Sequence, residues 1–492
     1  MTPYMDTRTS AVLDRLCRTA VILVTLVAGC HCGDPFCETA HVPYRPSATY
    51  SPRCAFVADA TAAVMPDEFE GRTLSLAECI LIALQRNPQT RIAWQASRSS
   101  AFQVGEERSS YWPQLDLTGS IARSDVLEDR QDLESPRNTA SASFGVRYLL
   151  FDGGVRNARV RGAEAELMAA NFQHNTILQD VALAVELAYH QRLAAKALVD
   201  VAQENVRRSE YNVKLAQARL KTGVSARFDV LTAETEKANA DLALVRARSI
   251  ERITQGRLAQ AMGIHVFYKF DIEDLPQDVH QEELADIEPL LQEATQARPE
   301  LQAALAEMAA RGEDADAAGA AYFPQLSANA DYGWRDETFL PSGEEWTVGF
   351  GLELPLFAGF SRTYRQARAG SEYEAAAAQY ENVLRGVELE VWTAYSRLIE
   401  AGEAIEAAKK LVASADESLH VAAGRYKAGV GNIIELVDAQ TAQTDAQTQH
   451  VRAVLSWYTA LARFERAIGR TLANPNPGAE VEPQGGEPDG GS

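Results

Sequence analysis

Two short stretches of the chain hold the residues whose types and spacing could do chemistry. They read LKTGVSARFDVLTAE over 220–234 and YKAGVGNIIELVDAQ over 426–440. Each stretch places a glycine six residues before a carboxylate, so that Gly223 precedes Asp229 and Gly429 precedes Glu435. Asp438 follows Glu435 by three residues, a spacing that puts both side chains on one face of a helix. Acids grouped in this way attract cations.

The same two stretches also have a purely structural interpretation. A glycine adopts the left-handed conformation that ends many helices at little cost. The chain then turns back, and an acid in the first turn of the returning helix is stabilised by the helix dipole by about 0.3–1 kcal/mol. We therefore expect hairpins that turn at Gly223 and Gly429. The acids are then either helix-start residues alone or a functional carboxylate cluster.

Enzymatic and nucleic-acid chemistry find little support in the sequence. The chain has no glycine-rich phosphate loop, no HExxH and no GxSxG. Its eight histidines are scattered, and two of them, His174 and His190, fall in long helical sequence, where a solvent-exposed face would accommodate them. The formal net charge of −21 argues against nucleic acid, because phosphate binding requires clustered Lys and Arg. We expect no enzyme, no nucleic-acid partner, no cofactor and no metal site.

The N-terminus has the pattern of an export signal. Arg15 and Arg18 precede an apolar run over 20–27, which predicts a signal peptide over 1–29. The run is much shorter than the ~20 residues that span a bilayer. It closes in Val-Ala-Gly-Cys, which resembles the lipobox of bacterial lipoproteins, where the cysteine becomes the acylated mature N-terminus. We therefore predict that Cys30 is lipidated.

A linker over 30–72 follows the predicted lipidation site. An exported chain reaches an oxidising compartment, where disulfides persist. A local disulfide between Cys32 and Cys37 is one possibility, but connectivity cannot be read from a sequence. A metal site that combines these cysteines with His31 and His41 is a weaker alternative, because the spacing matches no zinc pattern.

The rest of the chain contains an internal duplication. We predict two repeats, which cover residues 73–286 and 287–472. The residues over 473–492 are rich in Pro, Gly and acids, and we expect them to form a disordered tail. Each repeat has the order helix, strand pair, and very long helix with one glycine break. The first repeat has a longer, acidic loop between its strands, as length changes belong in surface loops. Matching pieces are SLAECILIALQRNP and IEPLLQEATQARP, YWPQL and YFPQL, and LLFDGG and PLFAGF.

Four segments alternate with the period of a strand. In WTVGFGLEL, over 346–354, every second residue is large and apolar, and similar patterns begin at Pro113, Ala140 and Gln325. Such strands suit a membrane β-barrel, although any one of them would also suit a half-buried sheet. Four strands cannot close a barrel, because small barrels need about eight. Open edges in lipid cost several kcal/mol for each unpaired group, so the chain is predicted to oligomerise.

Long proline-free stretches follow each strand pair, from about 156 to 263 and from 356 to 474. Ala, Glu, Gln, Arg and Leu dominate them, and all five are strong helix formers. About 65 helical residues would extend roughly 100 Å. No single globular core needs helices of this length, whereas a bundle or a tube does.

The ordered set of these pieces resembles the TolC-like outer-membrane efflux proteins over residues 73–472. The resemblance implies a mostly α fold with a membrane β-barrel, in which each protomer of a homotrimer gives four strands to a twelve-stranded barrel and its long helices to a periplasmic α-helical barrel. It implies a passive exit duct in the outer membrane, here lipid-anchored and in contact with outer-membrane lipid. The implied partners are a periplasmic adaptor and an inner-membrane transporter of the RND or ABC class. The alternative is a periplasmic helical adaptor or scaffold lipoprotein without a pore.

The resemblance also assigns roles at the helical tips. Glu435 and Asp438 match two acids that ring the pore constriction of the family, and Asp229 matches an acid of the first repeat in the same region. Tyr426 matches a tyrosine of the latch that holds the closed state. Gly431 stands where the family has the partner arginine of that latch, so the resemblance implies a different closed-state network here.

Overall fold

The computed structural model describes residues 71–124, 137–273, 286–336 and 343–470. All of these residues belong to one unit of the chain, residues 43–492. The predicted signal peptide, residues 30–70 of the predicted linker including Cys30, the acidic loop over 125–136, and the tail over 473–492 lie outside the described residues.

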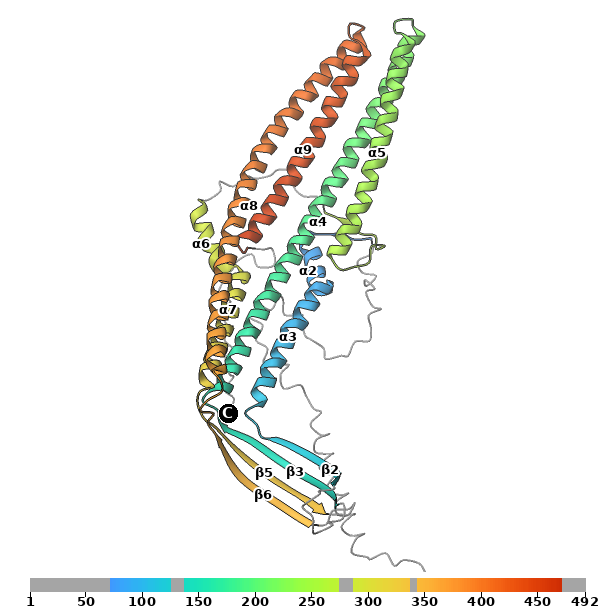
Figure 1. Cartoon of the computed structure of the whole chain (residues 1–492). Helices are drawn as coiled ribbons and strands as arrows, with labels where there is room; N and C mark the ends of the chain where they lie inside the picture. Colours follow the sequence, from blue (N-terminus) through green and yellow to red (C-terminus); the bar gives the residue numbers. More distant parts are fainter. Residues whose placement is uncertain (1–70, 125–136, 274–285, 337–342, 471–492) are drawn as a thin grey trace, which may run out of the picture. The chain divides into compact units, whose positions relative to one another are not determined.

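Four long helices form two hairpins of nearly equal size (Figure 1). Helix α4 is 67 residues long and α8 is 68, or about 100 Å each at 1.5 Å per residue, while α5 and α9 have 35 residues each. The prediction of a mostly helical fold with two very long helices is confirmed. The bounds are α4 (Val155–Lys221), α5 (Arg227–Ala261), α8 (Ser361–Ala428) and α9 (Ile433–Ala467).

A pair of shorter helices precedes each strand pair, where the sequence predicted one helix. The pairs are α2 (Leu76–Arg86) with α3 (Pro88–Ser109), and α6 (Ile287–Ala297) with α7 (Pro299–Ala320). Each helix breaks before a proline, because the ring forces the preceding residue out of the helical region. Asn87 and Arg298 are accordingly extended, with ψ values of 128° and 118°.

Four strands form one antiparallel sheet in the order β2-β3-β5-β6. Strands β3 and β5 come from different halves of the chain and pair at the centre, so the two halves share the sheet. A separate parallel pair joins β1 to β4. The bounds are β1 (Thr73–Leu74), β2 (Gln114–Ser124), β3 (Arg137–Phe151), β4 (Asp271–Ile272), β5 (Gln325–Asp336) and β6 (Gly343–Glu353).

The register of the larger sheet places the apolar residues of all four strands on one face. Leu117 lies opposite Phe144, Phe144 opposite Tyr332, and Tyr332 opposite Trp346. Within the chain this face is uncovered at its edges, since Leu117 is 69% exposed and Trp346 is 72% exposed. The other face is polar, and hydroxyl groups bond across it, as between Thr118 and Ser143 at 2.9 Å. The period-two pattern therefore predicted the two faces correctly.

His174 and His190 are buried, which corrects the prediction of a solvent-exposed face. Helix α4 is contacted by α3, α5, α7 and α9, so few of its positions face solvent. The His190 ring stacks on Tyr458 of α9, with ring centroids 4.8 Å apart. Among the described residues, no helix combines the length and the apolar character that crossing a bilayer requires.

Candidate functional site

Both long hairpins turn through the same hydrogen-bond pattern. Gly223 and Gly429 are left-handed, with φ values of 76° and 84°. The residue after each glycine, Val224 or Val430, donates its N–H to the carbonyl five residues earlier, at 3.0 and 3.1 Å. This is the bonding of a Schellman motif, in which a left-handed glycine satisfies the last carbonyls of a helix.

The predicted acids lie just beyond these turns. Asp229 is in the first turn of α5 and accepts a hydrogen bond from the Ser225 hydroxyl. Glu435 is in the first turn of α9, where its N–H donates to Asn432 Oδ1 at 2.7 Å. Its carboxylate Oε2 lies 3.7 Å from Nη2 of Arg425, and both side chains are about half exposed.

Glu435 and Asp438 lie on the same exposed side of α9, whereas Asp229 belongs to the other hairpin. Asp229 and Glu435 each contact a polar partner within their own hairpin.

Tyr426 lies where the two hairpins pack together. Its side chain is fully buried. Burial raises the pKa of the Tyr426 phenol, and the Ser225 hydroxyl acts in the opposite direction. The apolar cluster that surrounds the ring contains Ala216, Val230, Ala233, Ile433 and Leu436.

Arg219 of the first hairpin holds Tyr426 of the second. Its guanidinium carbon lies 4.3 Å from the centroid of the Tyr426 ring, and its Nη1 donates to the Tyr426 carbonyl oxygen. A desolvated contact between a cation and a ring contributes about 0.5–2 kcal/mol. Arg219 was not among the predicted site residues. Its position did carry a signal, because Arg219 and Arg425 each lie four residues before a turn glycine.

Gly431 is closely packed in the second turn. A Cβ at this position would lie 3.0 Å from the Tyr426 nitrogen and 3.1 Å from the Arg425 Cβ. A larger residue would press on the end of α8. The arginine that the family resemblance places at this position is thus replaced by a residue with no side chain, and the arginine contact to Tyr426 comes from Arg219 of the other hairpin.

At their far ends, α5 and α9 return to the breaks between the shorter helices. Asn87 Nδ2 donates to the Ala261 carbonyl at 2.9 Å, and Arg298 Nη1 donates to the Ala467 carbonyl at 3.1 Å. The two donors occupy equivalent places in the two halves, each immediately before a proline. Each satisfies a carbonyl that the end of a helix leaves without an intrahelical partner.

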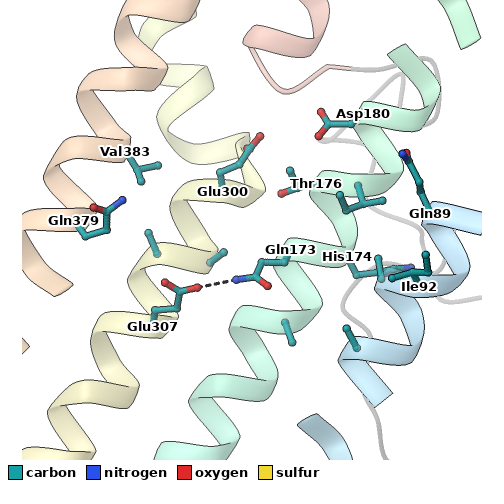
Figure 2. A pocket seen from close by; sticks show the side chains of 16 residues that line it. Gln89, Ile92, Gln173, His174, Thr176, Asp180, Glu300, Glu307, Gln379 and Val383 are labelled. Atoms are coloured by element: carbon teal, nitrogen blue, oxygen red, sulfur yellow. Dashed lines mark hydrogen bonds between the residues drawn. The ribbon is translucent and has the colours of Figure 1, made fainter. Parts of the chain in front are cut away.

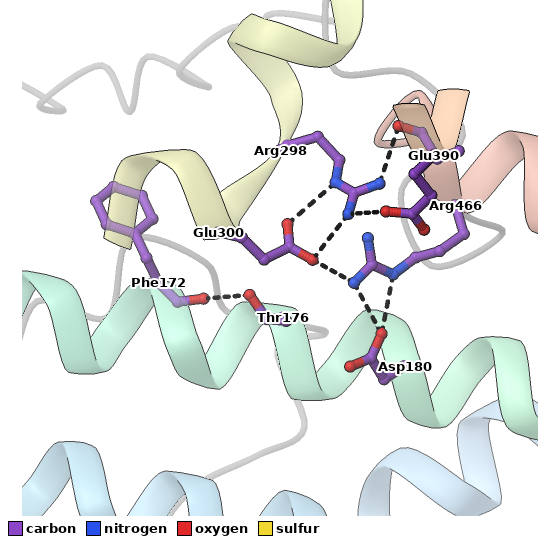
Figure 3. A network of polar contacts seen from close by, with 8 residues as sticks. Phe172, Thr176, Asp180, Arg298, Glu300, Glu390 and Arg466 are labelled. Carbon is purple, nitrogen blue, oxygen red and sulfur yellow. Dashed lines mark hydrogen bonds and ion pairs between the residues drawn. The ribbon is translucent and has the colours of Figure 1, made fainter. Parts of the chain in front are cut away.

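Arg298 also belongs to a network of charges that joins four helices (Figure 3). Its Nη2 lies 2.7 Å from Glu390 of α8, and its Nε lies 3.1 Å from Glu300 of α7. Arg466 of α9 contacts the same Glu300 and, at 2.8 Å, Asp180 of α4. Arg298 and Arg466 are both buried. Their carboxylate partners are only partly buried, because Glu390 and Asp180 are about half exposed, so the pairs stabilise the junction between the halves by less than fully buried pairs would.

Glu465 lies beside this network on α9. Burial, together with the Glu186 carboxylate of α4, raises the pKa of Glu465 to about 7, while Arg470 opposes the shift. The Glu186 Oε1 atom also lies 3.7 Å from Nε2 of the buried His190. A carboxyl group that changes charge near neutral pH is thus built into the contact between α4 and α9.

The described residues hold no group of three or more His, Cys, Asp or Glu arranged for a metal ion. Cys79 of α2 is buried, and burial raises the pKa of its thiol to about 12. Such a thiol is unreactive at neutral pH, because the thiolate is the nucleophile.

Two long helical hairpins that continue into a small antiparallel sheet define the class of this protein. The model of the outer membrane efflux protein family matches residues 80–264 and 290–470, which together are most of the chain. The chain belongs to this family and is an efflux protein of the outer membrane.

Individual relatives agree with this assignment. The chain is 28% identical over 421 residues to Protein CyaE of Bordetella pertussis, covering 83% of this chain and 87% of the relative. It is 25% identical over 406 residues to the outer membrane protein TolC of Vibrio cholerae, covering 80% and 90%. The structure of the outer-membrane channel OprN superposes with a TM-score of 0.72 over 87% of this chain and 98% of that one, at 20% identity, and so shares the fold.

Proposed function

We propose that three copies of the chain form a passive exit duct, in which twelve strands close one barrel and the long hairpins form a helical tube. A periplasmic adaptor and an inner-membrane transporter of the RND or ABC class would complete the export system. Energy would come from the transporter.

The observation that carries this proposal is the sheet. Its apolar face is exposed within the chain, and its outer strands β2 and β6 each pair on one side only among the described residues. In lipid, each unpaired backbone group at such an edge costs several kcal/mol. Pairing β6 of one chain with β2 of the next removes both edges, and lipid then covers the apolar face.

Native mass spectrometry of the purified protein in detergent tests this arrangement. We expect three copies, together with ion conductance after reconstitution into planar bilayers. A monomer that keeps its full β-sheet signal would contradict the barrel. A protein that stays in the periplasmic fraction would instead favour the helical scaffold without a pore.

Anchoring through Cys30 is part of the same proposal. Its support is the Val-Ala-Gly-Cys sequence at the end of the apolar run. Two or more acyl chains give stable anchoring, where one chain is marginal. Mass spectrometry of the mature N-terminus should show an acylated Cys30, and a mature chain that begins elsewhere without lipid would refute it.

A further inference from the structure

An open pocket of about 810 Å³ lies among α3, α4, α7 and α8, next to the charge network of Arg298 and Arg466 (Figure 2). This volume is within the range of about 300–1,000 Å³ that is typical of sites for drug-sized ligands. Small residues leave the space open, and larger aliphatic side chains add apolar surface to its wall. The apolar lining residues are Ala93, Ala96, Ala170, Ala303, Ala304, Ile92, Ile177 and Val383.

The polar groups of this pocket carry negative charge. Glu307 of α7 accepts a hydrogen bond from Gln173 of α4 at 2.7 Å, and this neutral partner leaves the carboxylate charge uncompensated. Asp180 and Glu300 line the end of the pocket near the network. None of the described residues that line the pocket is a lysine or an arginine.

The charge network does not cancel this negative potential. Burial opposes ionisation of Glu300, but Arg466 and Arg298 outweigh it and hold the pKa of this carboxyl below its usual value. Three carboxylates, of Asp180, Glu300 and Glu390, then face the two guanidinium groups. One negative charge remains in the network and a second on Glu307.

His174 supplies a second, independent observation at this pocket. Its side chain is 94% buried, since only 6% is exposed, and it lines the pocket. Its Nδ1 atom has no hydrogen-bond partner among the described residues. Buried polar atoms without a partner are rare in native proteins. Burial also lowers the pKa of His174, so the ring is neutral and adds no positive charge to the pocket.

We propose that this pocket binds lipophilic organic cations of drug size. The alanine, isoleucine and valine side chains that line the pocket would contact the apolar body of the ligand. Glu307, together with Asp180 and Glu300, would stabilise its positive charge. Anions of the same shape would be repelled by this net negative charge, and no lysine or arginine lines the pocket to bind them. The identification of such cations as cargo rests on the duct proposed above, whereas the binding itself does not.

The test uses the purified full-length protein in lipid nanodiscs, with tetraphenylphosphonium as the probe and tetraphenylborate as an anion of the same shape. Binding is measured by equilibrium dialysis, and binding to empty nanodiscs is subtracted. We expect saturable binding of the phosphonium at one site per chain. Binding of the borate should be weaker by at least about tenfold, because the exposed Glu307 carboxylate attracts the cation and repels the anion of the same shape.

Two variants test the two features that the proposal depends on, the carboxylate charge and the apolar space of the pocket. Glu307→Gln removes the charge with little change in shape, and we expect phosphonium affinity to fall by about five- to tenfold. Ala96→Phe fills the cavity from an exposed position on α3, and we expect loss of saturable binding. Matched controls are Glu374→Gln and Ala413→Phe, both at exposed positions of α8 outside the pocket, which should bind like the natural protein.

Equal binding of the two probes would overturn the proposal, and so would unchanged phosphonium binding in Glu307→Gln. Because Glu307→Gln is nearly isosteric, this outcome does not depend on whether Ala96→Phe folds. Conductance of the same purified protein, reconstituted into planar bilayers, separates the pocket from the duct. A conducting protein that fails to bind the phosphonium refutes only the pocket, and a binding protein that does not conduct refutes only the duct.

Discussion

At the scale of single residues, the exposed acids at the start of α9 offer the sharpest test of the pore. Three chains would bring three copies each of Glu435 and Asp438 to a narrow opening, and rings of Asp and Glu select for cations. We predict that Glu435→Ala with Asp438→Ala removes cation preference. Block by trivalent cations should weaken by at least about tenfold, since each surface charge contributes on the order of 1 kcal/mol. Single-channel conductance is the measurement.

The matched control for this experiment is Glu400→Ala with Glu403→Ala on α8. These acids have the same three-residue spacing and are also exposed, but they lie far from the turn at Gly429. The control should retain selectivity and block. If the tip variant retains them as well, Glu435 and Asp438 are helix-start residues and nothing more.

Because of Glu465, we predict that the stability of the folded chain depends on pH. Its pKa is raised to about 7 in the folded chain, above the ordinary value of 4.5. Between these values the folded chain holds a proton that the unfolded chain releases, so the contribution of this group to stability grows as pH falls through about 7. Glu465→Gln should therefore raise the urea midpoint strongly at about pH 8 and much less at about pH 5. Unfolding followed by circular dichroism would show this.

The control variant is Glu417→Gln, at an exposed position on α8. Its difference from the natural protein should be small and similar at both pH values. A Glu465→Gln effect that was equally small, or independent of pH, would show that the carboxyl group is solvated in solution.

Residue positions could be predicted from the sequence where local rules decide them. The helix dipole and the glycine turn placed Asp229 and Glu435 in first turns, and the structure has them there. Arg219 could not be found in this way, because its partner Tyr426 lies 207 residues away on the other hairpin. The burial of His174 likewise depends on helices that only the tertiary structure brings against α4.

At the scale of elements, the turns at Gly223 and Gly429 require glycine because of their left-handed backbone conformation, and not because neighbouring atoms leave no room for a side chain. A Cβ on Gly429 would meet nothing within 4 Å, yet its φ of 84° is unfavourable for any residue with a side chain. Gly429→Ala should destabilise the tip by about 1 kcal/mol, which is roughly a fivefold rise in amide hydrogen exchange at the end of α8. Exchange followed by mass spectrometry is the measurement.

The control is Gly424→Ala, five residues earlier, which we expect to stabilise the helix instead. Gly424 lies inside α8 and also has open space around its Cβ position, but its backbone is helical. Alanine there should slow exchange, since it favours a helix over glycine by about 1 kcal/mol. Equal effects of the two substitutions would mean that the left-handed turn is not retained in solution.

Elements with a long periodic pattern were predictable, and elements without one were not. Composition and the absence of proline indicated α4 and α8, and alternation indicated the four strands of the larger sheet. The breaks at Pro88 and Pro299 fell inside a continuous apolar pattern and were missed. The two-residue strands β1 and β4 are too short to have a period, and only their parallel pairing defines them.

At the scale of the whole molecule, the edges of the sheet predict which strands meet between chains. Ser120 of β2 and Thr347 of β6 belong to opposite edges, with β3 and β5 between them. The double variant Ser120→Cys with Thr347→Cys should form disulfides between chains after mild oxidation and give a ladder that stops at three copies in denaturing gels. Gly349→Cys and Gly351→Cys, on the same face of β6, extend the search over neighbouring registers.

Each single-cysteine variant is a control that should give no ladder to three copies. A cross-linked species that migrates as a monomer would place β2 beside β6 of the same chain and rule out the shared barrel. A ladder that continues beyond three copies would rule out the closed trimer.

The two junction residues, Asn87 and Arg298, have a consequence for symmetry. In the proposed ring of three chains the backbone would be almost six-fold, but its joints would alternate between a neutral amide at Ala261 and a charged guanidinium at Ala467. A side-chain amide is neutral and does not titrate, so the first kind of joint does not respond to pH. The guanidinium joint is held by Glu300, whose stabilising charge is lost as pH falls through its lowered pKa. Strong acid would therefore loosen the three Arg298 joints and leave the three Asn87 joints intact. The ring would then respond to acid with three-fold rather than six-fold symmetry.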